Sequence, residues 1–336
     1  MITDIDAAKR VVARALGRYG VAVDAAVTFV KYRENYVFRI DDAAGTYALR
    51  LHRHGYRSDA ELLEELELVT ALAAAGVAVP RVRPTIGGEP FCLVADDDGD
   101  AHQLDMLEWI PGADPLGDIG EAFLGSAAVD TATFQLLGAL IAGLHATVTT
   151  LRRDRPSARP AWDADGLVGE HPVWGDPRRV FDEGTPGRAT VGRAITLLRA
   201  ELDAYGTAPD RYGPIHADFT PENVLVDDGG HLTVIDFDDS GDGYYLFDLA
   251  TAAFFYLPHP RFDDVVEALL TGYQSVRPLS RDDLALWRPM LLARGLTYLG
   301  WAADRRGDET SDFIYEHLRP LVLDVAADFI AATVSP

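Results

Sequence analysis

The spacing of apolar residues in the first third of the chain predicts the order helix, strands, helix, strands. Residues 7–19 place apolar side chains three and four positions apart, as in an amphipathic helix, and Gly20 follows them. Short runs rich in β-branched and aromatic residues come next, separated by turn residues, which is typical of strands. The predicted strands cover residues 27–31, 35–40, 46–52, 91–94 and 103–110.

The helix between the third and fourth strands has the clearest local signal. Ser58 and Glu61 have the spacing of a capping box, in which each side chain accepts a hydrogen bond from the backbone N–H of the other residue. Leu62 and Leu66 lie on one face of the helix, and Gly76 ends it. The pattern therefore predicts one well-defined helix among the strands.

After Pro111-Gly112 the pattern is mostly helical. Predicted helices cover residues 134–148, 191–205, 262–274 and much of the chain after Ser280, and an aperiodic loop rich in Pro, Gly and Trp runs from about 154 to 190. We therefore predict an α+β fold with two lobes. Residues 1–110 would form a small β-rich lobe with one main helix, and residues 111–336 a larger, mostly helical lobe.

Composition narrows the possible partners. The 336 residues include 53 Asp or Glu and 30 Lys or Arg, for a formal net charge of −23, which argues against binding to nucleic acid. The N-terminus lacks the basic region and apolar run of a signal peptide, and the apolar stretch Leu249–Leu257 is about half a membrane span. The single cysteine, Cys92, cannot form an internal disulfide. We expect a cytoplasmic protein that binds no membrane, and its oligomeric state stays open.

Chemistry concentrates between residues 210 and 248, which hold ten acidic residues and one arginine. Residues 223–226 and 232–235 flank an Asp-Asp-Gly-Gly turn and should pair as a hairpin. That pairing would bring Asn223 near Asp236, and both carry the oxygen ligands that Mg²⁺ prefers. Asp218 precedes Asn223 by five residues and could reach a substrate hydroxyl. A base, an amide ligand and a carboxylate ligand are the minimum set for phosphoryl transfer from a nucleotide.

The run His216-Ala217-Asp218-Phe219-Thr220-Pro221-Glu222-Asn223, followed by the hairpin and Ile235-Asp236, resembles the catalytic and metal-binding loops of protein kinases. It is more similar still to the aminoglycoside phosphotransferase family, which includes choline, homoserine, macrolide and bacterial stress-response kinases. The resemblance extends from about Lys31 to Arg305. It implies a bilobal protein-kinase-like fold, ATP and Mg²⁺ as cofactors, and a hydroxyl group as the phosphoryl acceptor.

The resemblance also implies roles for single residues. Asp218 would accept or orient the proton of the attacking hydroxyl, while Asn223 and Asp236 would hold Mg²⁺ on the ATP phosphates. His216 would brace the catalytic loop. Asp248 would steady that loop by accepting backbone N–H bonds; alternatively it is an ordinary carboxylate in the first turn of a helix.

Two further acids follow the metal-binding aspartate, where a protein kinase has glycine. Asp238 and Asp239 either add charge around the metal or face water. We favour water for Asp239 and leave Asp238 open.

In the small lobe, the family resemblance places a cation on the third strand, where it contacts phosphates and pairs with a helix glutamate. Arg50 stands where lysine is more usual, so its planar guanidinium either binds phosphate oxygens or is exposed on a strand face. Glu65 is the better partner, because Glu61 is already used in the capping box.

Two loops of the small lobe also match the family. The turn with Glu34 and Asn35 has no glycine and resembles the Glu-Asn version found in small-molecule kinases, where backbone N–H groups contact phosphates. The segment 107–112 resembles the family hinge, in which adenine would pair with the backbone of Glu108 and Ile110; alternatively it is a plain strand end.

The acceptor site is the least defined part of the prediction. Aromatic and acidic residues that could line it include Trp174, Asp242, Tyr244 and Trp301. Such a site would favour a cationic acceptor through Coulomb attraction and cation–π contact. Arg294 and Arg305 would suit an anionic acceptor equally well, so the acceptor stays open.

The leading hypothesis is an ATP- and Mg²⁺-dependent kinase that acts on a hydroxyl of an aminoglycoside-, macrolide-, choline- or homoserine-like molecule. One alternative keeps the fold but makes the acceptor a protein serine or threonine, as in the stress-response kinases. A second is a phosphoesterase metal centre that includes His216 and Asp238, although such a site would need more histidines. A third is a nucleotide-binding pseudokinase that serves as a partner module.

Overall fold

The computed structural model describes residues 4–32, 35–151 and 156–334. The chain folds into two compact units. We call residues 1–114 with 225–238 the N-terminal unit, and residues 115–224 with 239–336 the C-terminal unit. The expected division at residue 110 thus differs from the observed one mainly in the segment 225–238, which belongs to the N-terminal unit.

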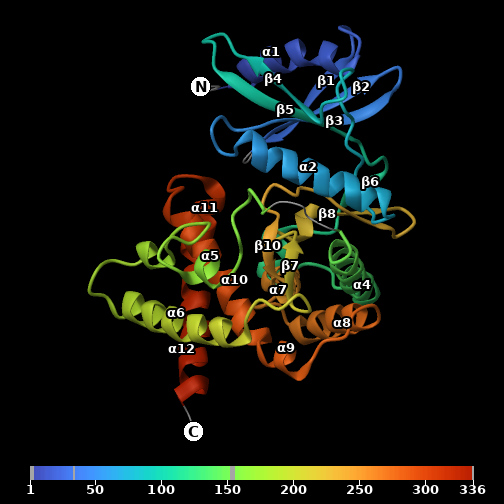
Figure 1. Ribbon diagram of the computed structural model, residues 1–336. Coiled ribbons are helices and arrows are strands. Elements are labelled where there is room, and N and C mark those ends of the chain that lie inside the picture. The colour runs from blue at the N-terminus through green and yellow to red at the C-terminus, as the bar shows by residue number, and fades with distance from the viewer. Residues whose placement is uncertain (1–3, 33–34, 152–155, 335–336) are drawn as a thin grey trace. The chain divides into compact units, whose positions relative to one another are not determined.

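The N-terminal unit is built on one antiparallel sheet. Its strands are β1 (Ala26–Tyr32), β2 (Tyr36–Asp42), β3 (Gly45–Leu51), β4 (Phe91–Ala95) and β5 (Ala101–Glu108), in the order β1-β2-β3-β5-β4. Helix α1 (Ile5–Leu16) lies on one side of the sheet and α2 (Asp59–Ala74) on the other, as Figure 1 shows. All five predicted strands and both predicted helices are present, with ends shifted by a few residues.

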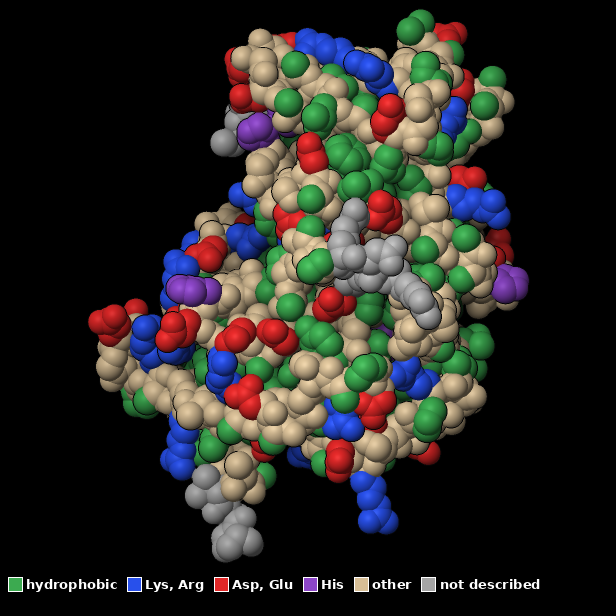
Figure 2. Space-filling view, in the orientation of Figure 1, with side chains coloured by type: hydrophobic (Ala, Val, Ile, Leu, Met, Phe, Trp, Pro, Cys, Tyr) green, Lys and Arg blue, Asp and Glu red, His purple; other side chains and the backbone are tan. Residues whose placement is uncertain are grey.

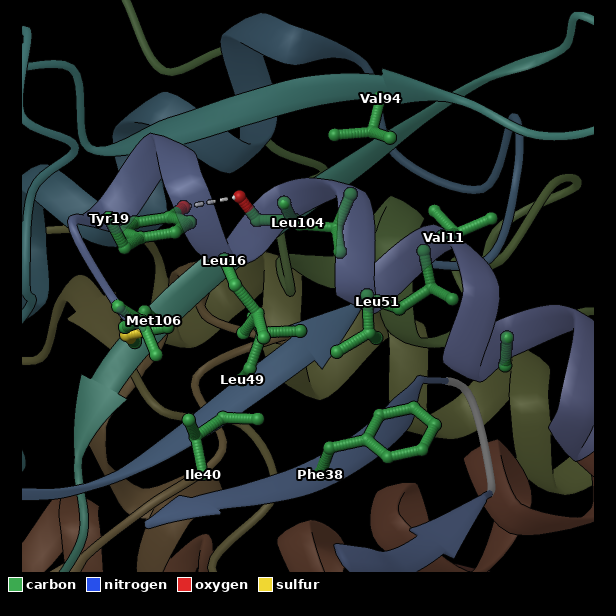
Figure 3. Close-up of a cluster of buried hydrophobic side chains, with 14 residues drawn as sticks. Val11, Leu16, Tyr19, Phe38, Ile40, Leu49, Leu51, Val94, Leu104 and Met106 are labelled. Atoms are coloured by element: carbon green, nitrogen blue, oxygen red, sulfur yellow. Dashed lines mark hydrogen bonds between the residues drawn. The ribbon is translucent and has the colours of Figure 1, made fainter. Parts of the chain in front are cut away.

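Each face of this sheet buries its own apolar cluster, because side chains alternate along a strand. Leu49 and Met106 lie on the α1 side, in the fully buried cluster drawn in Figure 3. Their strand neighbours Ala48 and Leu107 pack with Leu62 of α2. The capping box of Ser58 and Glu61 is formed, so α2 begins where the sequence predicts. The cluster on the α2 side is the smaller of the two, so other positions on that side of the sheet can carry polar side chains.

The predicted hairpin at residues 223–235 is also present. Strands β8 (Val224–Asp227) and β9 (Leu232–Val234) are neighbours in a three-stranded sheet, with β6 (Ala113–Pro115) on the other side of β8. The Asp227 carboxylate accepts the backbone N–H groups of Gly229 and His231 and so closes the turn. The Val234 N–H donates to the Ala78 carbonyl at 2.9 Å, which attaches the hairpin to the segment after α2. This bond is one of the contacts that attach residues 225–238 to the N-terminal unit.

The C-terminal unit is mostly helical. Its helices are α3 (Ile119–Phe123), α4 (Thr131–Val148), α5 (Ala164–Val168), α6 (Pro186–Tyr205), α7 (Tyr245–Phe254), α8 (Phe262–Gln274), α9 (Arg281–Ala285), α10 (Trp287–Ala303), α11 (Glu309–Phe313) and α12 (Arg319–Val334). A π-helical turn at Ile314–Leu318 joins the last two. Two short strands, β7 (Tyr212–Ile215) and β10 (Gly241–Tyr244), pair antiparallel among the helices.

Helices α4 and α8 approach each other closely through glycine. A Cβ atom on Gly138 would lie 2.1 Å from the Leu269 carbonyl oxygen, and one on Gly272 would lie 1.9 Å from the Gln135 carbonyl oxygen. By length and composition α4 is the one helix in the described part of the chain that could cross a membrane, and core helices of soluble proteins share these properties. Its contact with α8 places it within the helical packing of this unit.

We expect Gly138→Ala to destabilise the protein by about 1–3 kcal/mol, because the methyl group overpacks against backbone that cannot move aside. Gly143 lies on the same helix, and a Cβ there meets no atom within 4 Å. Gly143→Ala should therefore stabilise the protein by about 0.5–1 kcal/mol through helix propensity alone. Urea denaturation of both variants measures the difference. Equal effects of the two alanines would contradict the close α4–α8 contact.

Charge is spread over the surface. On the face shown in Figure 2, basic side chains (Lys and Arg) are interspersed among acidic ones. The pattern on this face differs from the continuous basic stripe of nucleic-acid-binding proteins.

Candidate active site

The loop after β7 carries Asp218, whose carboxylate is held on both oxygens. Arg294 of α10 donates from Nη2 to Asp218 Oδ1 at 2.6 Å, and Asn223 donates from Nδ2 to Asp218 Oδ2 at 2.8 Å. The Asn223 amide also donates to the Asp218 backbone carbonyl at 2.9 Å. The Asp218 side chain is 22% exposed, so it is anchored and still reachable from solvent.

Asp248 anchors the start of this loop. Its Oδ2 accepts the His216 backbone N–H at 3.0 Å, and its Oδ1 accepts the Ala217 N–H at 2.7 Å. Ala217 has a φ of 66°, a left-handed conformation that is unfavourable for residues other than glycine. The two hydrogen bonds hold the backbone in this conformation. Asp248 therefore bonds to the loop, as the family resemblance implies, rather than only to the first turn of α7.

A buried network supports Asp248 from the other side. His145 Nε2 lies 2.9 Å from Asp248 Oδ2, and His145 Nδ1 lies 3.0 Å from the Tyr273 hydroxyl. Burial lowers the pKa of His145, so the ring is neutral near pH 7. It then donates from Nε2 to Asp248 and accepts from Tyr273 at Nδ1.

His216 has a contact inside the loop. Its Nδ1 accepts the backbone N–H of Asp218 at 3.1 Å, and its ring packs on Phe219 with ring centres 4.6 Å apart. His216 is fully buried. This geometry suits a bracing residue.

Arg294 is the main residue of this site whose contacts sequence reasoning missed. It is fully buried, and besides Asp218 it donates from Nη1 to the Ala217 carbonyl at 3.0 Å. Its guanidinium lies 4.5 Å from the ring centre of Trp174 and 4.0 Å from that of Tyr298. The expectation that Arg294 would suit an anionic acceptor is corrected, because its charge already pairs with Asp218. The sequence did contain one signal for these contacts: an arginine within an otherwise apolar helix. Such an arginine is buried, and a buried charge needs an oppositely charged partner.

In the N-terminal unit, Arg50 is buried and pairs with two carboxylates. Its Nη2 donates to Glu65 Oε1 at 2.8 Å and to Asp105 Oδ2 at 2.7 Å, and its Nε donates to Asp105 Oδ1 at 2.9 Å. The ion pair with Glu65 follows the prediction, and the alternative of an exposed Arg50 is wrong, because the residue is 6% exposed. The α2 side of the sheet thus carries a cluster of charged side chains that hold one another in place.

Asp105 was missed, although it lies directly opposite Arg50 in the β3–β5 register. Burial alone would raise the pKa of Asp105, but Arg50 and His52 hold it at about 2. Burial also disfavours the charge on Arg50, yet Asp105 and Glu65 raise the pKa of Arg50 well above its usual value. Asp105 and Arg50 are therefore both ionised at neutral pH.

Asp236 follows β9 by two residues and belongs to the N-terminal unit, whereas Asp218 and Asn223 belong to the C-terminal unit. Its φ is 67°, and its side chain is 35% exposed. The Lys31 ammonium nitrogen, Nζ, lies 4.0 Å from Asp236 Oδ2. Asp236 thus presents a carboxylate at the end of the hairpin from a strained backbone position.

The two acids after Asp236 do not simply face water. Asp238 is buried, and Arg57 donates from Nη2 to its backbone carbonyl at 2.9 Å. Asp239 is partly buried and accepts the Trp174 indole N–H on Oδ1 at 3.1 Å. The expectation of a solvated Asp239 is therefore corrected.

The predicted hinge lies at the end of β5. Glu108 pairs with Tyr47, and its N–H donates to the Arg81 carbonyl at 2.8 Å, so it can offer adenine its carbonyl oxygen rather than its N–H. Ile110 is half-buried just after the strand. Asn35 is buried, and Glu34 lies outside the described residues.

The four acceptor candidates differ in position. Trp174 and Trp301 are half-buried, and Trp174 stacks on Arg294. Asp242 is partly buried on β10. Tyr244 is 1% exposed and donates its hydroxyl to the Leu202 carbonyl, so the prediction that it binds the acceptor is wrong. A tyrosine at the end of a paired strand, next to a helix, is a core residue here.

The chain is similar in sequence to known phosphotransferases. The model of the phosphotransferase enzyme family (APH) matches residues 28–289. Amicoumacin kinase of Bacillus subtilis (strain 168) is 26% identical over 254 residues, which cover 75% of this chain and 69% of that protein. Homoserine kinase of Chelativorans sp. (strain BNC1) is 30% identical over 279 residues, which cover 78% of this chain and 74% of that protein.

A solved structure agrees over nearly the whole length. The microcompartment-associated aminopropanol kinase superposes with a TM-score of 0.84 at 29% identity, and the match covers 96% of this chain and 98% of that one. The predicted protein-kinase-like α+β fold is confirmed by this similarity.

Proposed function

Because the chain belongs to the phosphotransferase enzyme family, we propose that it transfers the γ-phosphoryl group of Mg²⁺·ATP to a hydroxyl group of a small molecule. The observation that carries the proposal is the Asp218 carboxylate, which Arg294 and Asn223 hold from two sides while one edge stays exposed. A carboxylate fixed in this way can orient a substrate hydroxyl and take up its proton.

In the proposed reaction the acceptor oxygen forms a bond to the γ-phosphorus, and the bond from that phosphorus to the bridging oxygen of ADP breaks. The hydroxyl proton passes to Asp218. Because phosphoryl transfer goes through a loose transition state, the protein contributes mainly positioning and charge neutralisation. The anchored loop from His216 to Asn223 supplies the positioning.

The donor groups fit a magnesium ion that is held mainly by phosphates. Both Asn223 N–H bonds run to Asp218, so the amide oxygen Oδ1 is the atom that could ligate a metal. Asp236 supplies a carboxylate, and Mg²⁺ in kinases is commonly held by one or two such groups and by the nucleotide. Among residues 4–32, 35–151 and 156–334, no group of three or more His, Cys, Asp or Glu side chains is arranged so that it could hold a metal ion by itself, which favours this sparse site over the phosphoesterase alternative. When bound, the ion would neutralise charge on the phosphates.

In the small lobe we propose that Arg50, oriented by Glu65 and Asp105, faces the phosphates, and that adenine meets the backbone carbonyl of Glu108 and the backbone of Ile110. Backbone N–H groups of the turn that contains Glu34 and Asn35 would contact the phosphates. Asp248 and His216 are proposed as supports of the catalytic loop. Trp174, Asp242 and Trp301 remain candidates for contacts with the acceptor.

Acceptor-dependent release of ADP tests the proposal. The panel contains aminopropanol, choline, homoserine, an aminoglycoside, a macrolide and amicoumacin, each with Mg²⁺·ATP and with purified protein. We expect ADP release with at least one small hydroxylated compound, together with a phosphorylated product detected by mass spectrometry. A protein substrate rich in serine and threonine forms the opposing arm. Phosphate transfer to that protein, with none to any small molecule, would contradict the proposed acceptor class.

A further inference from the structure

A row of paired residues crosses the N-terminal sheet. Lys31 of β1 is opposite Val37 of β2, Val37 is opposite Arg50 of β3, and Arg50 is opposite Asp105 of β5. Directly opposed residues in antiparallel strands point to the same face of a sheet. Lys31 therefore lies on the face that carries Arg50, away from the α1 core.

An irregularity in β1 puts Lys31 on that face. Phe29 pairs with Phe38 and Lys31 pairs with Val37, so the register shifts between them and one extra residue is accommodated. In a regular ladder Val30 would be opposite Val37, and Lys31 would turn toward the α1 side. β-Bulges of this kind often re-aim a side chain next to a functional site.

The ammonium group of Lys31 lies close to the proposed metal-binding carboxylate. Its Nζ is 4.0 Å from Asp236 Oδ2, which is longer than a hydrogen bond, and the Lys31 side chain is 43% exposed. Lys31 is thus near Asp236 without being fixed to it. An ammonium on a flexible stem can move to an incoming anion.

Arg50 alone provides little net positive charge on this face. Its Nε and Nη2 groups donate to Asp105 and Glu65, so one guanidinium is surrounded by two carboxylates. A triphosphate carries several negative charges, and Asp236 adds another. A divalent ion offsets part of this charge, and Lys31, beside Asp236, is placed to offset more of it.

We propose that Lys31 binds the phosphate chain of the nucleotide, next to the divalent ion at Asp236. The inference rests on the proposed function, because it assumes a Mg²⁺-nucleotide at this face. In this arrangement Arg50 is the fixed element of the phosphate site, and Lys31 is the element that closes on the phosphates after they arrive.

Calorimetry with Lys31→Met tests the inference. The non-hydrolysable analogue Mg²⁺·AMP-PNP should bind the variant roughly 10- to 100-fold more weakly, the usual loss for one charge-assisted hydrogen bond. Adenosine, which has no phosphate, should bind as it does to wild type. Lys31→Arg should restore most of the affinity because it keeps the charge. The matched control is Lys9→Met, which removes the only other lysine of the chain from an exposed position of α1.

Covalent labelling gives an independent readout. A γ-acyl-phosphate of ATP transfers its acyl group to a nearby lysine: the amine forms an amide bond while the bond from the acyl carbon to the phosphate oxygen breaks. We expect peptide mass spectrometry to find the label on Lys31 and not on Lys9, and excess Mg²⁺·ATP to prevent it.

The outcomes separate the two proposals. If wild type binds Mg²⁺·AMP-PNP and Lys31→Met binds it equally well, with Lys31 unlabelled, the inference is overturned while the proposed function stands. If wild type gives no heat with Mg²⁺·AMP-PNP and no label, the proposed function fails and the inference falls with it.

Discussion

Asp218→Asn is expected to lower kcat by roughly 10²–10⁴, the range for loss of a general base, while Mg²⁺·ATP still binds. The amide cannot take up the acceptor proton. It also disturbs the anchoring, because Arg294 and Asn223 both donate to the carboxylate and an amide has only one oxygen. We expect the buried Arg294 to keep its hydrogen bond to that oxygen. The amide NH₂ of Asn223 would then face the NH₂ of the new side chain, and two donors cannot pair. Turnover is measured as acceptor-dependent ADP release on a substrate that wild type accepts.

The control for this variant is Asp228→Asn, which makes the same chemical change in the exposed turn of the β8–β9 hairpin. It should retain wild-type turnover. Calorimetric titration with Mg²⁺·AMP-PNP separates loss of chemistry from loss of nucleotide. Full activity of Asp218→Asn, with a fold confirmed by circular dichroism, would remove Asp218 from the mechanism.

Local signals were sufficient for much of the fold. The capping box at Ser58 and the Asp-Asp-Gly-Gly turn each depend on residues close in sequence, and both appear in the structure as predicted. The predicted catalytic loop also depends on residues close in sequence, since His216, Asp218 and Asn223 lie within eight residues. Strands β7 and β10 were missed because each has four residues and pairs with a distant partner.

The partners that fix the site could not be read from local patterns. Arg294 reaches Asp218 across 76 positions, and Asp105 reaches Arg50 across 55. Only the rule that a buried charge needs an opposite charge connects such pairs, and it does not say which acid is chosen. Tyr244 shows the converse error: its aromatic ring suggested a binding surface, whereas burial in the core decides its role.

The position of Asp236 makes asparagine the right substitution for testing the metal site. At a φ of 67° an alanine would be strained, whereas asparagine adopts this region more readily than most residues. Asp236→Asn therefore removes the charge of the proposed ligand and keeps the backbone. A loss of the magnesium dependence of nucleotide binding can then be assigned to the metal ligand rather than to a distorted loop.

We expect Asp236→Asn to abolish the dependence of nucleotide binding on magnesium. Wild type should bind AMP-PNP at least 10-fold more tightly with Mg²⁺ than with EDTA, because the ion bridges the phosphates and a carboxylate. In the variant the two dissociation constants should approach each other, near the wild-type value in EDTA. Asp228→Asn serves again as the control and should keep the full response to magnesium. An unchanged affinity of Asp236→Asn for Mg²⁺·AMP-PNP would mean that the divalent ion is held elsewhere, and the role of the hairpin in metal binding would have to be given up.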